Sequence, residues 1–537
     1  MSATPLLRVT DLVTTFTTPT EVVRAVDGVS FEVLPGRILG IVGESGSGKS
    51  VTSRSILRMV RAPGRIESGS IELSGRDVLA LSESEMRKVR GREIAMIFQD
   101  PQSTLNPVMT IGSQIEEAMR IHGVDSATAR RRAIELLTQV GIPNPESAVD
   151  RYQHEFSGGM RQRVVIAIAL ANNPTLLLAD EPTTALDVTI QAQILELLRT
   201  LRDQLGIAII LITHDMGVVA EICDDVLVMY RGEIVERGTV RQVLTSPEHP
   251  YTQKLMKAVP KMDAPLRPAP PASSPPVLEV RDLRTNVLAG ARGVFRKRAP
   301  FYAVDGVSLA VHAGETLALV GESGCGKSTL SRTVVGIHRA ASGSILVNGQ
   351  DVTERTPENV QATIANVQYV FQDPYSSLNP RRTAGQSIEE ALLESGCPRD
   401  ELRDRSVELF EKVGLSASYL DRYPFAFSGG QRQRIGIARA LAGRAKALIL
   451  DEPVSALDVS IQSEIIELLM ALQEDMNLGY LFISHDLAVV REISHRVAVM
   501  YHGRIVETGT TAEVFGNPND PYTKKLLAST PRLDSAR

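Results

Sequence analysis

Two hydrophobic patterns alternate along this chain. Short, mostly apolar runs at residues 38–42, 176–179, 316–320 and 447–450 have the length and composition of buried strands. Between them lie longer segments of helix-forming residues, and residues 108–172 and 381–443 are especially poor in strand signals. This alternation favours an α/β fold with a largely parallel sheet, and the two helix-rich segments predict a helical subdomain inserted ahead of an acidic strand.

The pattern occurs twice, because the same ordered words return in the second half of the chain. Matching residues are 278 positions apart in the glycine-rich words, 273 in the FQDP words, and a constant 271 from the FSGG words onward. Two homologous domains are therefore predicted, at residues 1–262 and 277–537. Residues 261–276 hold six prolines, which favours an extended linker at residues 263–276.

Composition limits the classes of function that the chain can have. Lys plus Arg is 58 and Asp plus Glu is 63, a net charge of −5 among 537 residues, which argues against bulk nucleic acid binding. The apolar runs are too short to span a bilayer and no signal peptide is visible, so the cytosol is the expected compartment. The three cysteines, Cys223, Cys325 and Cys397, lie far apart and match no metal-ligand spacing.

The glycine-rich words, GESGSGKS and GESGCGKS, match the phosphate-binding loop G-x-x-x-x-G-K-[ST] between a predicted strand and helix. Glycines let backbone N–H groups surround phosphate oxygens, while the lysine reaches the β- and γ-phosphates and the serine holds Mg²⁺. A glycine-rich turn is the plain alternative, but two matches at repeated positions leave it little room. The predicted nucleotide-binding residues here are Gly43, Ser45, Gly46, Gly48, Lys49, Ser50 and Val51, and Gly321, Ser323, Gly324, Gly326, Lys327, Ser328 and Thr329.

An acidic pair closes one apolar strand in each copy: Asp180-Glu181 and Asp451-Glu452. Downstream of a phosphate-binding loop, such an aspartate can support Mg²⁺ and such a glutamate can polarise the attacking water. The pairs therefore predict metal ligation by Asp180 and Asp451, and catalysis by Glu181 and Glu452.

Further repeated words make the chain resemble two tandem ATP-binding cassettes of ABC transporters. The resemblance implies a RecA-like core with an inserted helical subdomain in each copy, and an ATPase that uses ATP and Mg²⁺. It adds Gln99 and Gln372 as nucleotide and Mg²⁺ contacts and His214 and His485 as catalytic switch residues. It also implies signature loops that contact ATP, at Ser157, Gly158 and Gly159, with Met160 in place of the commoner glutamine, and at Ser428, Gly429, Gly430 and Gln431.

The same resemblance implies that each ATP lies between the phosphate-binding loop of one copy and the signature loop of the other, at two composite sites. An aromatic residue that stacks on adenine is also implied. Phe16 fits this role in the first copy. The matching segment of the second copy ends in Val287, so either Phe295 or Tyr302 substitutes there or the second copy lacks the contact.

Narrower similarity comes from the words HPYT at residues 249–252 and DPYT at 520–523, with FQDP-x-S-x-LNP in both copies. They resemble the dipeptide, oligopeptide and nickel import subfamily, including fused members that serve peptides or glutathione. The implied partners are two membrane permeases and an extracytoplasmic binding protein, and the implied location is the cytoplasmic face of the cell membrane. No iron–sulfur cluster is expected, because residues 238–276 contain no cysteine.

Two alternatives remain at this level. A tandem-cassette factor acting on ribosomes or DNA would usually have a long charged linker or CxxC modules, and this sequence shows neither feature. A sugar importer with two fused cassettes fits poorly with the second copy's intact glutamate and its FQDP and PYT words.

Overall fold

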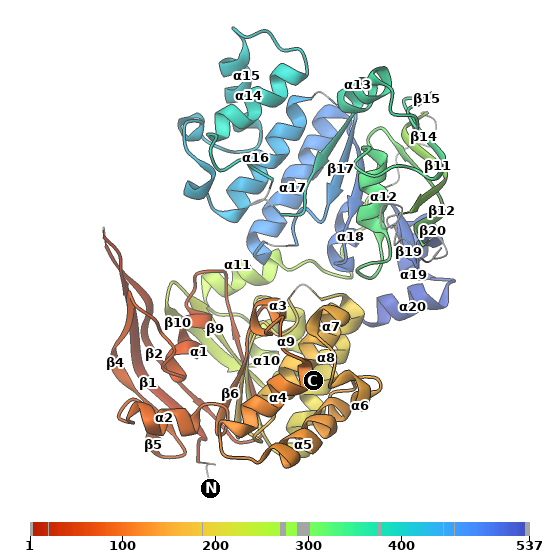
Figure 1. The fold of residues 1–537 in the computed structure, drawn as a ribbon. Coiled ribbons are helices and arrows are strands. Elements are labelled where there is room, and N and C mark those ends of the chain that lie inside the picture. The colour runs from red at the N-terminus through yellow and green to blue at the C-terminus, as the bar shows by residue number, and fades with distance from the viewer. Residues whose placement is uncertain are drawn as a thin grey trace. The chain divides into compact units, whose positions relative to one another are not determined.

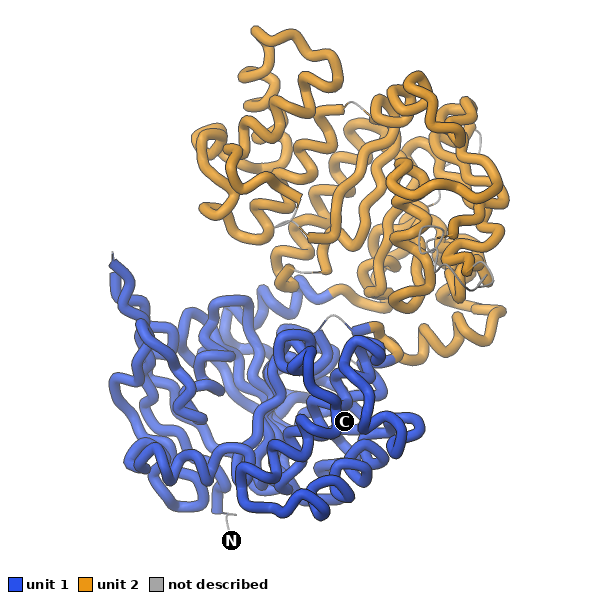
Figure 2. Tube along the Cα trace, viewed as in Figure 1, with its two compact units in different colours: residues 1–186, 190–259, 531–537 blue, residues 187–189, 260–530 orange. Residues whose placement is uncertain are grey.

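A computed structural model describes residues 4–19, 21–184, 186–268, 275–286, 301–373, 377–443, 445–455 and 457–531. They form two compact units, one built mainly from residues 1–186 and 190–259 and the other mainly from residues 260–530 (Figure 2). Each unit has its own pair of sheets and its own buried core (Figure 1). Among the described residues, no helix is long and apolar enough to cross a membrane.

The first unit contains two sheets. An antiparallel sheet has the order β2-β1-β4-β5 and consists of β1 (Leu7–Thr17), β2 (Val22–Val33), β4 (Gly64–Leu73) and β5 (Arg76–Asp77). A six-stranded sheet has the order β10-β9-β3-β8-β7-β6 and consists of β3 (Ile38–Val42), β6 (Ile94–Ile97), β7 (Leu176–Asp180), β8 (Ala208–Thr213), β9 (Asp225–Tyr230) and β10 (Glu233–Thr239). Its neighbours are parallel except for β9 and β10.

Helices of the first unit fall into three groups along the chain. Those ahead of the helical segment are α1 (Lys49–Ile56) and α2 (Glu83–Val89). The helical segment consists of α3 (Pro101–Thr104), α4 (Ile111–Arg120), α5 (Ser126–Gln139), α6 (Pro145–Ala148), the 3₁₀ turn η1 (Gln153–Glu155) and α7 (Gly158–Ala169). The remainder are α8 (Val188–Leu205), α9 (Met216–Ile222), α10 (Val240–Thr245) and α11 (Pro250–Ala258).

The second unit repeats this order. Its antiparallel sheet, β12-β11-β14-β15, consists of β11 (Pro276–Asn286), β12 (Tyr302–His312), β14 (Ser342–Val347) and β15 (Gln350–Asp351). Its six-stranded sheet, β16-β17-β18-β13-β19-β20, consists of β13 (Thr316–Val320), β16 (Val367–Val370), β17 (Ala447–Asp451), β18 (Gly479–Ile483), β19 (Arg496–Tyr501) and β20 (Arg504–Thr510). Its helices are α12 (Lys327–Val334), α13 (Pro357–Asn366), α14 (Ala384–Glu394), α15 (Leu402–Lys412), η2 (Ala417–Tyr419), η3 (Pro424–Ala426), α16 (Gly429–Ala442), α17 (Val459–Met476), α18 (Leu487–Ile493), α19 (Thr511–Gly516) and α20 (Pro521–Ala528).

The predicted buried strands are confirmed as β3, β7, β13 and β17, and every residue in them is buried. Strands β7 and β17 run one residue further than predicted and end on Asp180 and Asp451. The helix-rich segments form α4 to α7 and α14 to α16 as expected. The antiparallel sheets were not predicted, because exposed polar residues interrupt strands such as β1 and hide their apolar face.

The parallel strands bring the predicted site residues to one edge of each sheet. In the first unit β6, β7, β8 and β3 are consecutive neighbours, and their carboxyl ends lead into Gln99, Asp180, His214 and the phosphate-binding loop respectively. Carboxyl ends of neighbouring parallel strands meet at one edge, which is where open α/β sheets bind ligands. The second unit has the same arrangement.

The predicted linker, residues 263–276, is described only at residues 263–268 and 275–276. The Arg267 side chain donates to Gln473 Oε1 at 2.8 Å and to the Ile493 carbonyl at 3.3 Å. This part of the linker is therefore bonded to the second unit. The domain boundaries stay a prediction.

Candidate nucleotide-binding sites

The phosphate-binding loops adopt backbone conformations that glycine permits. Gly48 precedes α1 with φ 102°, and a Cβ placed on it would lie 2.2 Å from the Ala25 carbonyl oxygen. Gly326 precedes α12 with φ 114°, and its Cβ would lie 2.2 Å from the Ala303 carbonyl oxygen. A larger residue would displace the neighbouring backbone, so each loop is closely fitted to the strand that carries the alanine.

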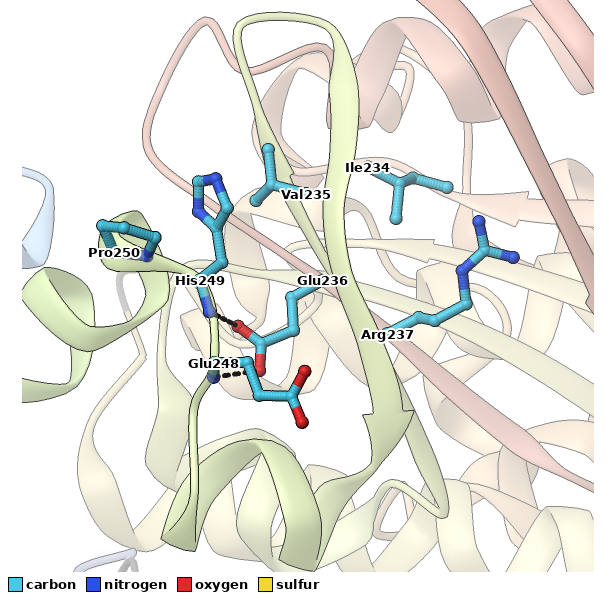
Figure 3. A pocket seen from close by; sticks show the side chains of 7 residues that line it. All are labelled: Ile234, Val235, Glu236, Arg237, Glu248, His249 and Pro250. Carbon is cyan, nitrogen blue, oxygen red and sulfur yellow. Dashed lines mark hydrogen bonds between the residues drawn. The ribbon is translucent and has the colours of Figure 1, made fainter.

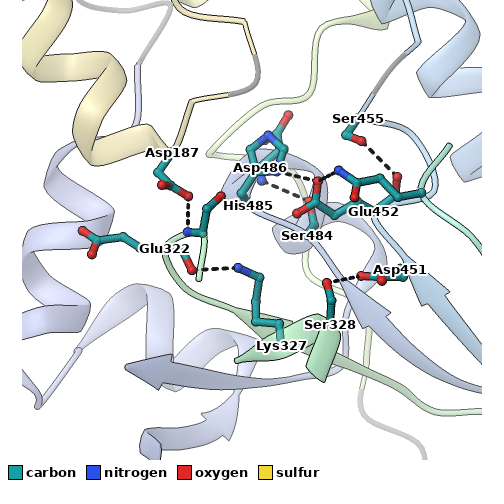
Figure 4. Close-up of polar contacts among 12 residues, drawn as sticks. Asp187, Glu322, Lys327, Ser328, Asp451, Glu452, Ser455, Ser484, His485 and Asp486 are labelled. Carbon is teal, nitrogen blue, oxygen red and sulfur yellow. Dashed lines mark hydrogen bonds and ion pairs between the residues drawn. The ribbon is translucent and has the colours of Figure 1, made fainter. Parts of the chain in front are cut away.

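Each loop lysine lies buried across its own loop. Lys49 is 5% exposed, and its Nζ donates to the carbonyls of Gly43 at 2.7 Å and Glu44 at 2.8 Å. Lys327 Nζ makes the same contacts, with Gly321 at 2.6 Å and Glu322 at 3.0 Å (Figure 4). The ammonium groups therefore sit at the carboxyl edge of the sheet, where a phosphate chain bound by the loop would meet them.

The residue after each lysine is bonded to the strand-end aspartate. Ser50 Oγ donates to Asp180 Oδ1 at 2.8 Å, and Ser328 Oγ donates to Asp451 Oδ1 at 3.1 Å. Burial raises the pKa of both aspartates. A buried carboxylate beside a hydroxyl supplies the hard oxygen donors that Mg²⁺ prefers, so these two pairs fit a magnesium ion.

In the first unit a cluster of donors surrounds Glu181. Gln99 Nε2 and Thr184 Oγ1 each donate to Glu181 Oε2 at 2.8 Å, and His214 Nδ1 lies 3.3 Å from Glu181 Oε1. Burial raises the pKa of Glu181, but the bonds from His214 and Thr184 and the charge of Lys49 outweigh it and lower the pKa to about 2. Glu181 is therefore fully ionised near neutral pH.

The second unit repeats the cluster around Glu452. Gln372 Nε2 donates to Glu452 Oε2 at 2.8 Å, and His485 Nδ1 lies 3.2 Å from the same oxygen. Burial raises the pKa of Glu452, but the bond and charge of His485 and the charge of Lys327 lower it overall. Glu181 and Glu452 both have a φ of 48°. The Glu181 N–H donates to the Ile212 carbonyl and the Glu452 N–H donates to the Ile483 carbonyl, each at 2.9 Å and each on the neighbouring strand. The two glutamates therefore share the same strained backbone conformation at the start of their side chains.

The signature loops begin helices. Ser157 is the N-cap of α7 and accepts from the Met160 N–H at 3.3 Å, while Ser428 caps α16 and accepts from the Gln431 N–H at 3.3 Å. Gln431 also accepts from the Ser428 N–H at 3.1 Å, which closes a capping box. Methionine cannot return this bond, so the Met160 substitution leaves the first loop with a simpler cap. Gly158 and Gly159, and Gly429 and Gly430, form the first turns of these helices.

The adenine contacts are less well defined. Phe16 lies near the end of β1, and its ring occupies the space beside Gly64, where a Cβ would lie 2.6 Å from it. In the second unit Tyr302 begins β12 and lies beside the Arg284 guanidinium, 5.9 Å from the ring centroid. Val287 and Phe295 lie outside the described residues. For the described residues Phe16 and Tyr302, the role of stacking on adenine stays a prediction.

Sequence reasoning missed three contacts. Thr184 donates to Glu181, and Tyr369 donates to Asp451 Oδ2 at 2.6 Å. The third is the hydroxyl of the tyrosine in each PYT word, which accepts a hydrogen bond from a phosphate-binding loop. The repeated PYT words were a visible signal for this contact, but nothing in the sequence showed which loop the tyrosines reach.

Comparison with known proteins shows the family of the chain. The ABC transporter family matches residues 26–184 and 304–455, and the oligopeptide/dipeptide transporter C-terminal region matches residues 235–285 and 506–537. The chain therefore belongs to the ABC transporter family, and it is an importer-type ATP-hydrolysing subunit with two cassettes.

Among its relatives, the glutathione import ATP-binding protein GsiA of Escherichia coli O157:H7 is 48% identical over 100% of this chain and 91% of the relative. The protein of the same name from Escherichia coli strain K12 is 47% identical over the same shares. Among solved structures, a dimeric ATP-binding cassette in a post-hydrolysis state with ADP and phosphate covers 44% of this chain and 99% of its own, with 27% identity and a TM-score of 0.40.

Proposed function

We propose that this chain drives the import of glutathione or similar short peptides through separate permease subunits. The observation that carries the proposal is the duplication of one complete polar array, in a chain matched over its whole length by glutathione import ATP-binding proteins. In each array a buried lysine, a serine–aspartate pair and a Gln–Glu–His cluster lie around one phosphate-binding loop. Two working ATPase sites are thus proposed.

Each group in the array has a distinct proposed task. Loop N–H groups and Lys49 or Lys327 hold the phosphates of ATP. Ser50 with Asp180, and Ser328 with Asp451, would hold Mg²⁺ together with the amide oxygen of Gln99 or Gln372. When bound, the metal supplies positive charge that stabilises the phosphoryl oxygens.

Glu181 and Glu452 are proposed to orient and polarise the attacking water. Glu181, with a pKa near 2, is a weak base at pH 7, so its fixed negative charge and position matter more than its capacity to store a proton. His214 and Gln99 contact different oxygens of the Glu181 carboxylate, whereas His485 and Gln372 contact the same oxygen of Glu452. The glutamine can therefore sense both the metal and the water-orienting group.

Partners and location follow from the proposed role. An import ATP-binding subunit works with membrane permeases, and we propose two of them with an extracytoplasmic binding protein that selects the solute. The chain would then lie at the cytoplasmic face of the cell membrane. The importer C-terminal region, present after both cassettes, favours this over a tandem-cassette factor for ribosomes or DNA. The expected lack of an iron–sulfur cluster stays a prediction from the cysteine pattern.

Uptake of labelled glutathione tests the proposal. Cells that carry the cognate permeases and binding protein should accumulate it with the wild-type chain, and Lys49→Ala with Lys327→Ala should abolish uptake while the protein level is unchanged. A dipeptide of similar size, tested in parallel, separates a glutathione importer from a general peptide importer. Uptake that persists in the double variant would refute the proposal.

A further inference from the structure

The importer C-terminal region reaches the phosphate-binding loop of its own unit. The N–H of Glu44 donates to Tyr251 Oη at 3.0 Å, and the N–H of Glu322 donates to Tyr522 Oη at 2.9 Å. Glu44 and Glu322 are the second residues of the two loops. The carbonyls of these same glutamates accept from Lys49 and Lys327. One residue of each loop is therefore held on both sides, by the tyrosine and by the lysine.

The tyrosine rings are themselves fixed. Tyr251 is 9% exposed and stacks on Tyr230, with ring centroids 4.2 Å apart and an interplanar angle of 29°. Tyr522 stacks on Tyr501 with the same separation and angle. Burial raises the pKa of Tyr522, so its phenol is neutral at physiological pH. A stacked ring that is buried, as in Tyr251, or partly buried, as in Tyr522, has little freedom to move its hydroxyl away from the loop.

The turn that presents each tyrosine is held by a glutamate from the preceding strand. Glu236, on β10, accepts from the backbone N–H groups of Glu248 at 2.8 Å and His249 at 3.1 Å (Figure 3). Glu507, on β20, accepts in the same way from Asn519 at 2.8 Å and Asp520 at 3.1 Å. The next residue is the proline that begins α11 or α20, followed by the tyrosine. A continuous series of bonds thus runs from strand to turn to tyrosine to loop.

We infer that Tyr251 and Tyr522 are positioning residues that fix the phosphate-binding loops before nucleotide arrives, so that the C-terminal region is part of each nucleotide site. The inference rests on the proposed function in taking these loops to bind ATP. A loop held in its binding conformation loses less freedom on binding, which increases affinity without any contact to the ligand. These contacts are retained in both copies of the repeat, which supports a role beyond the packing of one helix.

Tyr251→Phe and Tyr522→Phe remove only the hydroxyl and keep the stacked ring. Amide hydrogen exchange in the nucleotide-free chain should become about 3- to 10-fold faster at residues 43–48 in the first variant and at residues 321–326 in the second, the scale of one lost hydrogen bond. The loop of the other unit should be unchanged and serves as an internal control. Tyr230→Phe and Tyr501→Phe are matched controls, since they alter the partner ring and should leave both loops unchanged.

Binding and turnover provide the second readout. Each tyrosine variant should bind a non-hydrolysable ATP analogue about 3- to 10-fold more weakly at one of its two sites, while kcat at saturating ATP changes less than about twofold. Glu236→Gln should weaken the first site in the same direction. Unchanged loop exchange, or equal effects in the control variants, would overturn the inference. Failure of the wild-type chain to bind the analogue would instead overturn the proposed function, because loop exchange tests the tyrosine contact without nucleotide.

Discussion

Gln99 and Glu181 are joined by a hydrogen bond, in which Gln99 Nε2 donates to Glu181 Oε2 at 2.8 Å. Gln372 and Glu452 have the same bond at 2.8 Å. Each glutamine follows the end of one strand and each glutamate follows its parallel neighbour. The residue proposed to sense the metal is therefore in contact with the residue proposed to orient water, and a change at one must alter the other.

Neutralising either glutamate should slow hydrolysis and spare binding. Glu181→Gln and Glu452→Gln keep the size of the side chain but remove the charge that polarises water, and loss of such a group costs about 10² to 10⁴ in rate. Single-turnover measurements on each variant, with the other site intact, should show the loss at one site. The exposed Glu135→Gln serves as the control. Full transport in either single variant would contradict two working sites.

Truncating the glutamine should affect coupling more than binding. Gln99→Ala and Gln372→Ala each remove the amide that donates a hydrogen bond to Glu181 or Glu452, while the phosphate-binding loop and its lysine stay intact. We expect ATP affinity within about threefold of wild type, and a larger fall in glutathione uptake per ATP hydrolysed. Equal losses in affinity and uptake would show that the glutamines only bind nucleotide.

Asymmetry between the units should appear at the turn before each signature loop. Glu155 Oε2 accepts from the Tyr152 N–H at 2.8 Å, whereas Ala426 stands at the matching position of the second unit and has no side-chain acceptor. Glu155→Ala should therefore weaken the first turn and lower uptake, with ATP binding unchanged. Uptake and ATPase rates measured together check this, and unchanged uptake would assign Glu155 to local structure alone.

The polar array around each phosphate-binding loop was predictable because its residues follow strand ends at fixed places in repeated words. Lys49, Asp180 and His214 needed only the order of the strands to be placed together. Tyr369 was not predictable, since its counterpart in the first unit is Met96 and a single tyrosine in a four-residue strand carries no pattern. The Tyr251 contact was equally hidden, because a bond to a backbone N–H depends on tertiary geometry, which side-chain patterns do not encode.

Tyr369 should stabilise the second unit. Its hydroxyl donates to Asp451 Oδ2 at 2.6 Å, and Ser331 Oγ lies 3.0 Å from the same hydroxyl. Tyr369→Phe leaves a buried carboxylate oxygen with one donor fewer, which should lower the free energy of unfolding by about 1 to 2 kcal/mol. Urea unfolding measures the change. Tyr419→Phe, in the same unit, is the control, and an equal effect in both variants would contradict a specific bond.

The last prediction concerns acid stability and begins at His495. The Thr316 N–H donates to His495 Nδ1 at 2.9 Å, so this nitrogen must be unprotonated in the folded state. His495 is 5% exposed, and burial together with the charge of Arg267 lowers its pKa from 6.5 to about 4. At the matching position of the first unit, Asp224 accepts from the Ile38 N–H at 2.8 Å. Only the second unit places a histidine at this position.

The pKa of His495 is lower in the folded state than in the unfolded state. The folded state therefore loses stability at pH values where this histidine is protonated in the unfolded chain. The contribution of His495 to the free energy of unfolding is fully present above about pH 6.5. It is lost as the pH falls from there towards 4, and the loss is about 2 kcal/mol at pH 5. His495→Asn keeps an acceptor without a titrating group and should remove this loss. Thermal unfolding at pH 7.5 and 5 should therefore show a smaller acid shift for His495→Asn than for the wild type. The control is His338→Asn, which should retain the wild-type shift, and an acid shift equal in all three chains would refute the assignment to His495.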